Sequence, residues 1–110
     1  MRIFHLTTPG VWAAAQEAGS YTQSTRDRTL AEEGYIHCSE EHQVEPVRAR
    51  WYDGVPDLLL LEIDTDLLTS PWRNEQLADT DQAYPHVYGP LDLDAVVAAG
   101  PYQRLPAPRR

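Results

Sequence analysis

The sequence is poor in cysteine, with a single one among its 110 residues, so the chain cannot form a disulfide within itself. It also has no apolar run near the roughly 20 residues that a membrane-spanning helix needs. The start, "MRIFHLTTPG", carries one charge and then a strand-like pattern, unlike the apolar stretch of a signal peptide. These absences predict a soluble cytoplasmic protein.

Positive charge is also scarce. Nine Lys and Arg residues against 17 Asp and Glu residues give a formal net charge of −8 and a pI near 4.7. Such a surface repels phosphate and lacks the counterion release that supplies most non-specific affinity for nucleic acid. Anionic membrane surfaces are disfavoured for the same reason. We therefore expect a small-molecule substrate, no nucleic acid and no membrane partner, while the oligomeric state stays open.

Several motifs of cofactor and nucleophile sites are missing. The chain has neither common form of the Gly-rich phosphate loop and no Gly-x-Ser-x-Gly elbow. None of the ligand spacings that usually mark zinc sites is present. We expect no cofactor and no metal.

What is present is the composition of a globular domain, with 42% hydrophobic and 24% charged residues. The length is sufficient for one hydrophobic core without disulfides or a structural metal. We predict a single α+β domain over residues 1–104. The final "LPAPRR" predicts a flexible tail over residues 105–110.

Two main helices are predicted from their end signals. Thr8 is a typical N-cap before the first helix, which Gly19 ends. Ser39 is a plausible N-cap for a second helix that runs to about Tyr52, and Pro46 predicts a kink or restart within it. The residues expected to face inward from the second helix are Val44, Val47 and Trp51.

Strands are predicted where short β-prone runs lie between turn residues. The four leucines of "DLLLLEID" suit a strand that is covered on both faces, and hence a central one. Residues 91–102 fit either a helix or a turn followed by an edge strand. The expected strands cover residues 2–6, 35–39, 57–64, 70–76 and 84–90, with a short helix at 28–33 and a loop at 77–83.

Alternation along a strand sorts the side chains of "YIHCS" onto two faces. Tyr35, His37 and Ser39 share one face, and Cys38 points to the other. His37 and Cys38 therefore cannot form a nucleophile–base pair with each other. Free cysteine is among the most buried residue types, so Cys38 is interpreted as a core residue.

The same rule applies to the two other strands that carry histidine. In "YPHVYG" it aligns Tyr84, His86 and Tyr88, and in "RIFHLT" it aligns His5 with Thr7. If these strands lie close together in one sheet, their polar faces converge on one cleft. Each residue also has an ordinary structural interpretation, such as a histidine satisfied by a carbonyl, but the repeated pattern favours a site.

Histidine can give and take a proton near neutrality because its unperturbed pKa is about 6.5. The predicted catalytic residues are His37 and His86 as an acid–base pair, Tyr88 as an oxyanion or leaving-group donor, and Ser39 as an orienter. The predicted substrate-binding residues are His5, Thr7, Tyr35, Glu75 and Tyr84, with Glu75 a candidate to orient one imidazole. A zinc or iron site made of His5, His37 and His86 is a formal alternative.

Four segments resemble a small bacterial family known as domain of unknown function 952. They are "IFHLTTP", "EGYIHCS", "LLLLEID" and "YPHVYGPL" followed by "DAVV", and the resemblance extends from Ile3 to about Tyr102. That family is similar to the ADP-ribosyltransferase fold, which implies a split, mostly antiparallel sheet with two main helices and a nicotinamide-dinucleotide cleft.

The resemblance to that fold also implies site positions. His5 and Thr7 match its first motif strand, where Leu6 replaces the usual glycine, and Ser39 matches the small hydroxyl residue of its second. Transferases of that fold usually carry a glutamate at the start of a late strand, where this chain has Tyr84-Pro85-His86. This departure weakens the case for ADP-ribosyl transfer.

Three functions follow as hypotheses. The first is a cofactor-independent enzyme that applies histidine and tyrosine acid–base catalysis to a small organic molecule, by dehydration, conjugate addition or cyclisation. The second is a dinucleotide-using ADP-ribosyltransferase or glycohydrolase. The third is a non-catalytic module that binds a metabolite.

Overall fold

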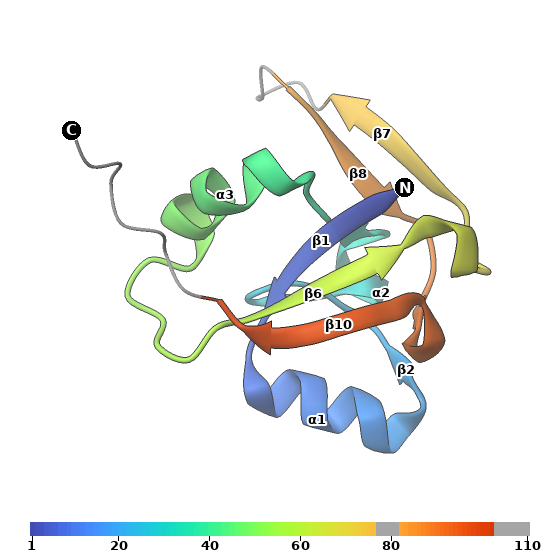
Figure 1. The fold of residues 1–110 in the computed structure, drawn as a ribbon, viewed down its shortest axis with the longest axis horizontal. Helices are drawn as coiled ribbons and strands as arrows, with labels where there is room; N and C mark the ends of the chain where they lie inside the picture. Colours follow the sequence, from blue (N-terminus) through green and yellow to red (C-terminus); the bar gives the residue numbers. More distant parts are fainter. Residues whose placement is uncertain (77–81, 103–110) are drawn as a thin grey trace.

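The computed structural model describes residues 1–76 and 82–102. A central antiparallel sheet has the strand order β1-β6-β10, with β1 at Arg2–Thr7, β6 at Leu59–Asp64 and β10 at Val96–Pro101 (Figure 1). The leucine run therefore forms the central strand, as predicted. Its Leu61 belongs to one buried cluster and its Leu60 packs against another, so the strand has apolar contacts on both faces.

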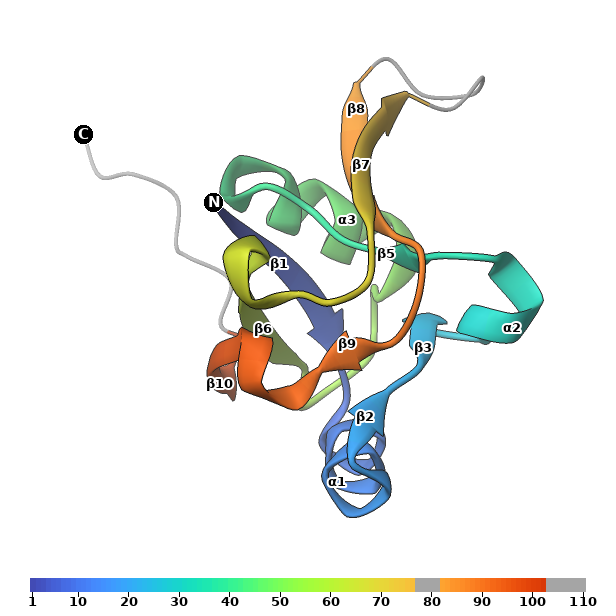
Figure 2. The same ribbon diagram turned by 90° about the vertical axis from the view of Figure 1, so that its right-hand side faces the viewer.

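A second antiparallel sheet has the order β5-β8-β7, with β5 at Ile36–His37, β8 at Ala83–Val87 and β7 at Trp72–Gln76. One isolated bridge joins the two sheets: the Phe4 amide donates to the Ser39 carbonyl at 2.7 Å, and the Ser39 amide donates to the Phe4 carbonyl at 2.8 Å. In Figure 2 the β7–β8 hairpin stands beside α3 and extends away from the central sheet.

Four short strands form two further antiparallel ladders. β2 (Ser20–Tyr21) pairs with β9 (Leu91–Asp92), and β3 (Gln23–Thr25) pairs with β4 (Arg28–Thr29). The chain is thus a small mixed α and β fold with mostly antiparallel sheets and few helices.

The first helix agrees with its sequence signals. α1 spans Pro9–Ala18, the Thr8 hydroxyl accepts from a first-turn amide, and Gly19 closes the helix at a φ of 89°. That left-handed conformation favours glycine because it has no Cβ. The short α2 spans Leu30–Glu33 and carries a capping box at its start.

The second main helix ends where it was predicted to, near Tyr52, but its start differs from the prediction. Ser39 is not its N-cap, because the Ser39 backbone pairs with β1; instead Glu40 precedes a 3₁₀ turn, η1 (Glu41–Gln43). α3 then spans Val44–Trp51, so the predicted restart lies just before Pro46. Val44 and Val47 are buried as expected, but Trp51 is 49% exposed and does not face the core.

The predicted strands at 35–39 and 84–90 are shorter in the structure, ending at His37 and Val87. After β6, the 3₁₀ turn η2 spans Thr65–Leu67. Residues 91–102 form β9, the 3₁₀ turn η3 (Leu93–Ala95) and β10 at the sheet edge, which confirms the turn-and-strand alternative over a helix. The predicted loop at 77–83 lies largely outside the described residues, and the tail at 105–110 lies wholly outside them.

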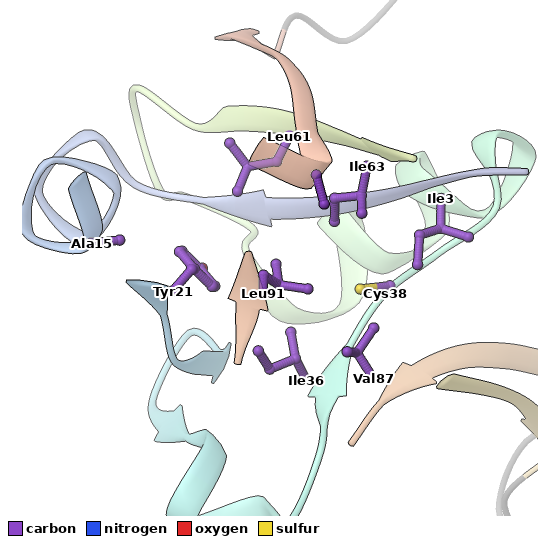
Figure 3. Close-up of a cluster of buried hydrophobic side chains, with 10 residues drawn as sticks. Ile3, Ala15, Tyr21, Ile36, Cys38, Leu61, Ile63, Val87 and Leu91 are labelled. Carbon is purple, nitrogen blue, oxygen red and sulfur yellow. The ribbon is translucent and has the colours of Figure 1, made fainter. Parts of the chain in front are cut away.

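The main hydrophobic core lies between the central sheet, β5 and β8 (Figure 3). Cys38 is 1% exposed within it, which confirms its interpretation as a core residue, and burial raises the pKa of its thiol. A second cluster lies under α3 and includes Phe4, Val47 and Tyr52. None of the helices in the described part of the chain is long and apolar enough to cross a membrane.

Candidate active site

His37 and His86 are direct neighbours across the β5–β8 pair, and Arg73 of β7 lies opposite His86 on the other side. Directly paired residues present their side chains on the same face of a sheet. The two imidazole centroids are 5.4 Å apart. The strand-parity prediction is therefore confirmed for these two histidines.

A carboxylate holds one edge of His86. The Nδ1 atom of His86 lies 2.9 Å from Oε1 of Glu75, and the Tyr88 hydroxyl donates to the same oxygen. The hydrogen bonds from Tyr88 and His86 lower the pKa of Glu75, because they stabilise the carboxylate form. The bond to Glu75 in turn raises the pKa of Tyr88, since its proton is held by an anion.

Aromatic rings enclose the His86 imidazole. Tyr35 stacks on it with centroids 4.0 Å apart and an interplanar angle of 24°, and the Tyr84 ring lies 5.2 Å from His37. The Arg73 guanidinium lies 5.1 Å from the centre of the Tyr88 ring. His86 is 0% exposed, and its Nε2 has no hydrogen-bond partner within residues 1–76 and 82–102.

His37 lies between this cluster and a pocket on the side of α3. It is half-buried, and burial together with the neighbouring His86 and His5 lowers its pKa to about 4. Its imidazole is therefore neutral at pH 7 and can accept a proton or a hydrogen bond.

The pocket beside His37 is small, with an internal volume of about 10 Å³, which is room for about one water molecule. Ser39 lines it with His37, as their shared face predicts, and Trp51 and Tyr52 come from the end of α3. The Tyr52 hydroxyl donates to the Leu6 carbonyl at 3.2 Å, so its proton is already used. Two larger hollows lie elsewhere, along α1 and beside Tyr102, and contain none of the strand histidines.

His5 does not share a face with His37, contrary to the prediction. The bridge between Phe4 and Ser39 places Phe4 on the His37 face, so the neighbouring His5 points to the other side. His5 fills the space where β1 and β5 part, with Nδ1 2.7 Å from the His37 carbonyl oxygen and Nε2 2.6 Å from the Tyr21 hydroxyl. It is 3% exposed, and burial lowers its pKa to about 4.

Thr7 belongs to the same interior network, since its hydroxyl lies 2.8 Å from that of Tyr21. Both are buried, and burial raises the pKa of Tyr21. The structure thus assembles six of the nine predicted site residues around His37 and His86 and leaves Ser39 in the adjoining pocket. His5 also lines that pocket and bonds to the His37 carbonyl, whereas Thr7 is linked to it only through Tyr21.

The sequence analysis missed several residues around the site, among them Arg73 over the Tyr88 ring. Tyr21 and Ser24 lie in "SYTQS", a segment too irregular for strand parity to be assigned, and Trp51 and Tyr52 were placed on α3 without a role. Within the described residues, no group of three or more His, Cys, Asp or Glu side chains is placed to hold a metal ion. The zinc or iron alternative built on His5, His37 and His86 is therefore wrong in its geometry.

Solved structures of protein CC0527 from Caulobacter crescentus have a similar fold. A crystal structure is 24% identical with a TM-score of 0.79, covering 92% of this chain and 85% of that one, and a double mutant is 23% identical with the same score and coverage. A solution structure is 24% identical with a TM-score of 0.73, over 90% and 82% of the two chains.

No curated protein matches the sequence. The family described as "Protein of unknown function (DUF952)" matches residues 6–99, which is most of the chain. This range contains His37, His86 and their contacts on β7 and β8. The protein therefore belongs to the DUF952 family.

Proposed function

We propose that this protein is an enzyme that moves protons on a small organic molecule by cofactor-independent acid–base catalysis. The carrying observation is the position of His37, which lines a pocket on one side and faces the Glu75–His86 pair on the other. His37 is the group that contacts the substrate, because the His86 ring is fully covered. Such a catalyst contributes on the order of 10²–10⁴ in rate.

The Glu75–His86 pair supports His37 from behind. A carboxylate accepts a hydrogen bond only, so Glu75 fixes the His86 proton on Nδ1 and leaves Nε2 as a proton acceptor. Nε2 has no partner among the described residues, so it is available for a proton that His37 receives. We assign Tyr88 to holding the Glu75 carboxylate in place. To act as an oxyanion or leaving-group donor, Tyr88 would have to release Glu75 and donate to the substrate instead.

The reactions that suit this arrangement begin with removal of a proton next to a carbonyl. Elimination of water, conjugate addition and ring closure all use this step, and each also needs an acid that gives a proton to the leaving or accepting atom. Ser39 shares the pocket with His37 and is the proposed orienter, while Tyr35 and Tyr84 form aromatic walls around the two imidazoles.

The test is turnover in a mixed pool of small metabolites, followed by mass spectrometry, for the wild type and for His37→Asn and His86→Gln. We expect wild-type protein to convert at least one compound, and each variant to lose that conversion while its melting temperature stays close to wild type. His42→Asn is the matched control, because His42 is exposed on η1. Conversion that survives in both variants would overturn the proposal. A compound that binds to the wild type and to all the variants without being converted would instead favour a metabolite-binding module.

A second candidate is an ADP-ribosyltransferase-like enzyme or glycohydrolase that uses a nicotinamide dinucleotide. Two observations favour it: among the described residues the Phe4–Ser39 bridge is the only backbone pairing between the two three-stranded sheets, and Glu75 supplies a carboxylate beside the histidines. Its test is thermal shift and nicotinamide release with the dinucleotide at millimolar concentration. No shift and no release would remove this candidate.

A further inference from the structure

Among the described residues that line the pocket beside His37, Trp51 alone is exposed, with 49% of its surface open to solvent. The other lining residues are buried or half-buried. The pocket therefore opens to solvent beside the Trp51 indole, and a molecule that approaches His37 from this side contacts that ring. An indole that stays half open to water also forgoes part of the stabilisation that its burial would bring to the fold, which leaves contact with a ligand as a reason for its position.

Trp51 is the last residue of α3, and the preceding arginine holds its ring. The Arg50 guanidinium lies over the ring, 5.0 Å from its centre. A cation on the face of an aromatic ring is attracted by the ring's electrons and restrains its orientation. A flat group that rests on this indole therefore meets a surface that is already oriented, which reduces the entropy cost of binding.

The pocket behind Trp51 has room for only one water-sized group, about 10 Å³. A hydroxyl oxygen has that size, whereas a carbon skeleton does not. No neighbouring residue bonds to a ring nitrogen of His37 within residues 1–76 and 82–102. Burial and the nearby His86 and His5 lower the pKa of His37 to about 4, so at neutral pH its uncharged imidazole keeps a nitrogen that can accept a hydrogen bond.

The charge of the lining also limits what can enter. Its described part contains no acidic or basic side chain besides the imidazoles of His5 and His37. His5 already uses both ring nitrogens, on the His37 carbonyl and the Tyr21 hydroxyl. Burial of a charged group without a partner is costly, so the pocket suits a neutral O–H donor.

We propose, on the basis of the function proposed above, that the substrate is a small neutral compound of the phenol or enol class, whose flat part stacks on Trp51 while its hydroxyl enters the pocket and donates to His37. Stacked aromatic groups gain free energy beyond the area that they bury. An enol is also the form of a carbonyl compound in which the proton next to the carbonyl has moved to the oxygen, which connects this class with the reaction proposed above.

The experiment measures dissociation constants by NMR titration of the protein at neutral pH with phenol, anisole and cyclohexanol at millimolar concentration. Phenol has a flat ring and a hydroxyl, anisole keeps the ring without the O–H, and cyclohexanol keeps the hydroxyl on a ring that is not flat. Wild-type protein should bind phenol most tightly and each of the others roughly three- to tenfold more weakly, the effect of one neutral hydrogen bond or one aromatic contact.

Two variants assign the two contacts. Trp51→Leu should weaken phenol and anisole alike by roughly threefold or more, with a melting temperature close to wild type because the side chain is half exposed. His37→Phe keeps a ring but has no acceptor, so it should weaken phenol and leave anisole unchanged. Leu67→Ala removes a 50% exposed side chain from η2 and is the matched control, which should bind all the probes like the wild type.

Equal phenol binding by Trp51→Leu and the wild type would overturn the inference, as would anisole that binds the wild type as tightly as phenol. No phenol binding by the wild type would also overturn it and would leave the proposed function to the metabolite assay, which does not depend on this substrate class. Phenol binding that follows the expected pattern, without conversion of any metabolite, would support the site and count against the proposed enzyme.

Discussion

The imidazole of His5 is bonded to the backbone of His37, with Nδ1 2.7 Å from the carbonyl oxygen. A carbonyl oxygen only accepts, so Nδ1 carries the proton, and neutral His5 must accept at Nε2. The Tyr21 hydroxyl, 2.6 Å from Nε2, therefore donates to His5, and the Tyr21 and Thr7 hydroxyls lie 2.8 Å apart. These hydrogen bonds hold the His37 backbone from the interior through a buried His5.

Stability should fall when the solution is acidified from about pH 6.5 to pH 4. The pKa of His5 is lowered to about 4 in the folded chain, below its ordinary value of 6.5, so the unfolded state binds more protons in this range. The stabilisation is fully present above pH 6.5 and is lost as the pH falls toward 4. The upper limit for this one residue is about 3 kcal/mol. Urea unfolding at several pH values measures it.

His5→Asn is the matched variant for that prediction, because its amide nitrogen can replace Nδ1 toward the His37 carbonyl without titrating. It should be less stable at pH 7 and show a smaller loss of stability between pH 6.5 and 4. An acid response identical to that of the wild type would contradict a buried neutral His5 as the cause.

Glu75→Gln should lower the pKa of Tyr88. The carboxylate raises that pKa by holding the phenol proton, and a neutral amide holds it less strongly. Ultraviolet titration of tyrosinate absorbance should therefore show one tyrosine ionising at lower pH in the variant. Burial raises the pKa of Tyr52 to about 12, so this residue titrates well above the range of interest. Glu62→Gln, on the central sheet, should leave the Tyr88 titration unchanged, and an unchanged titration in Glu75→Gln would refute the contact.

Cys38 should react with a thiol reagent only when the protein unfolds. It is 1% exposed, and burial raises the pKa of the thiol, so little thiolate is present at neutral pH. Cys38→Ser should destabilise the fold more than Cys38→Ala, because the new hydroxyl enters an apolar cluster without a partner, a cost of roughly 1–3 kcal/mol. Urea unfolding ranks the two variants, and rapid labelling of the native protein would contradict the prediction.

Sequence reasoning succeeded where alternation within each strand was enough to place a side chain. Alternation correctly joined His37 and His86, because β5 and β8 pair directly and share their faces. It failed for His5, since the phase of β1 relative to β5 depends on the Phe4–Ser39 bridge, a contact between residues 35 positions apart that no local pattern encodes. The same bridge explains why Ser39 is not a helix cap: its backbone is already engaged with β1.

The histidines should differ in reactivity toward diethyl pyrocarbonate, a reagent that attacks accessible neutral imidazole. His42 is exposed and should react first, half-buried His37 next, and the buried His5 and His86 last. Tyr35→Ala removes the ring that stacks on His86 at 4.0 Å, so His86 should react at least several-fold faster in this variant. His5 should stay unreactive, because it is buried away from Tyr35. Peptide mapping by mass spectrometry reads all four sites in one experiment. Fast labelling of His86 in the wild type would mean that Tyr35 does not cover it, and His86 would then be free to contact substrate in place of His37.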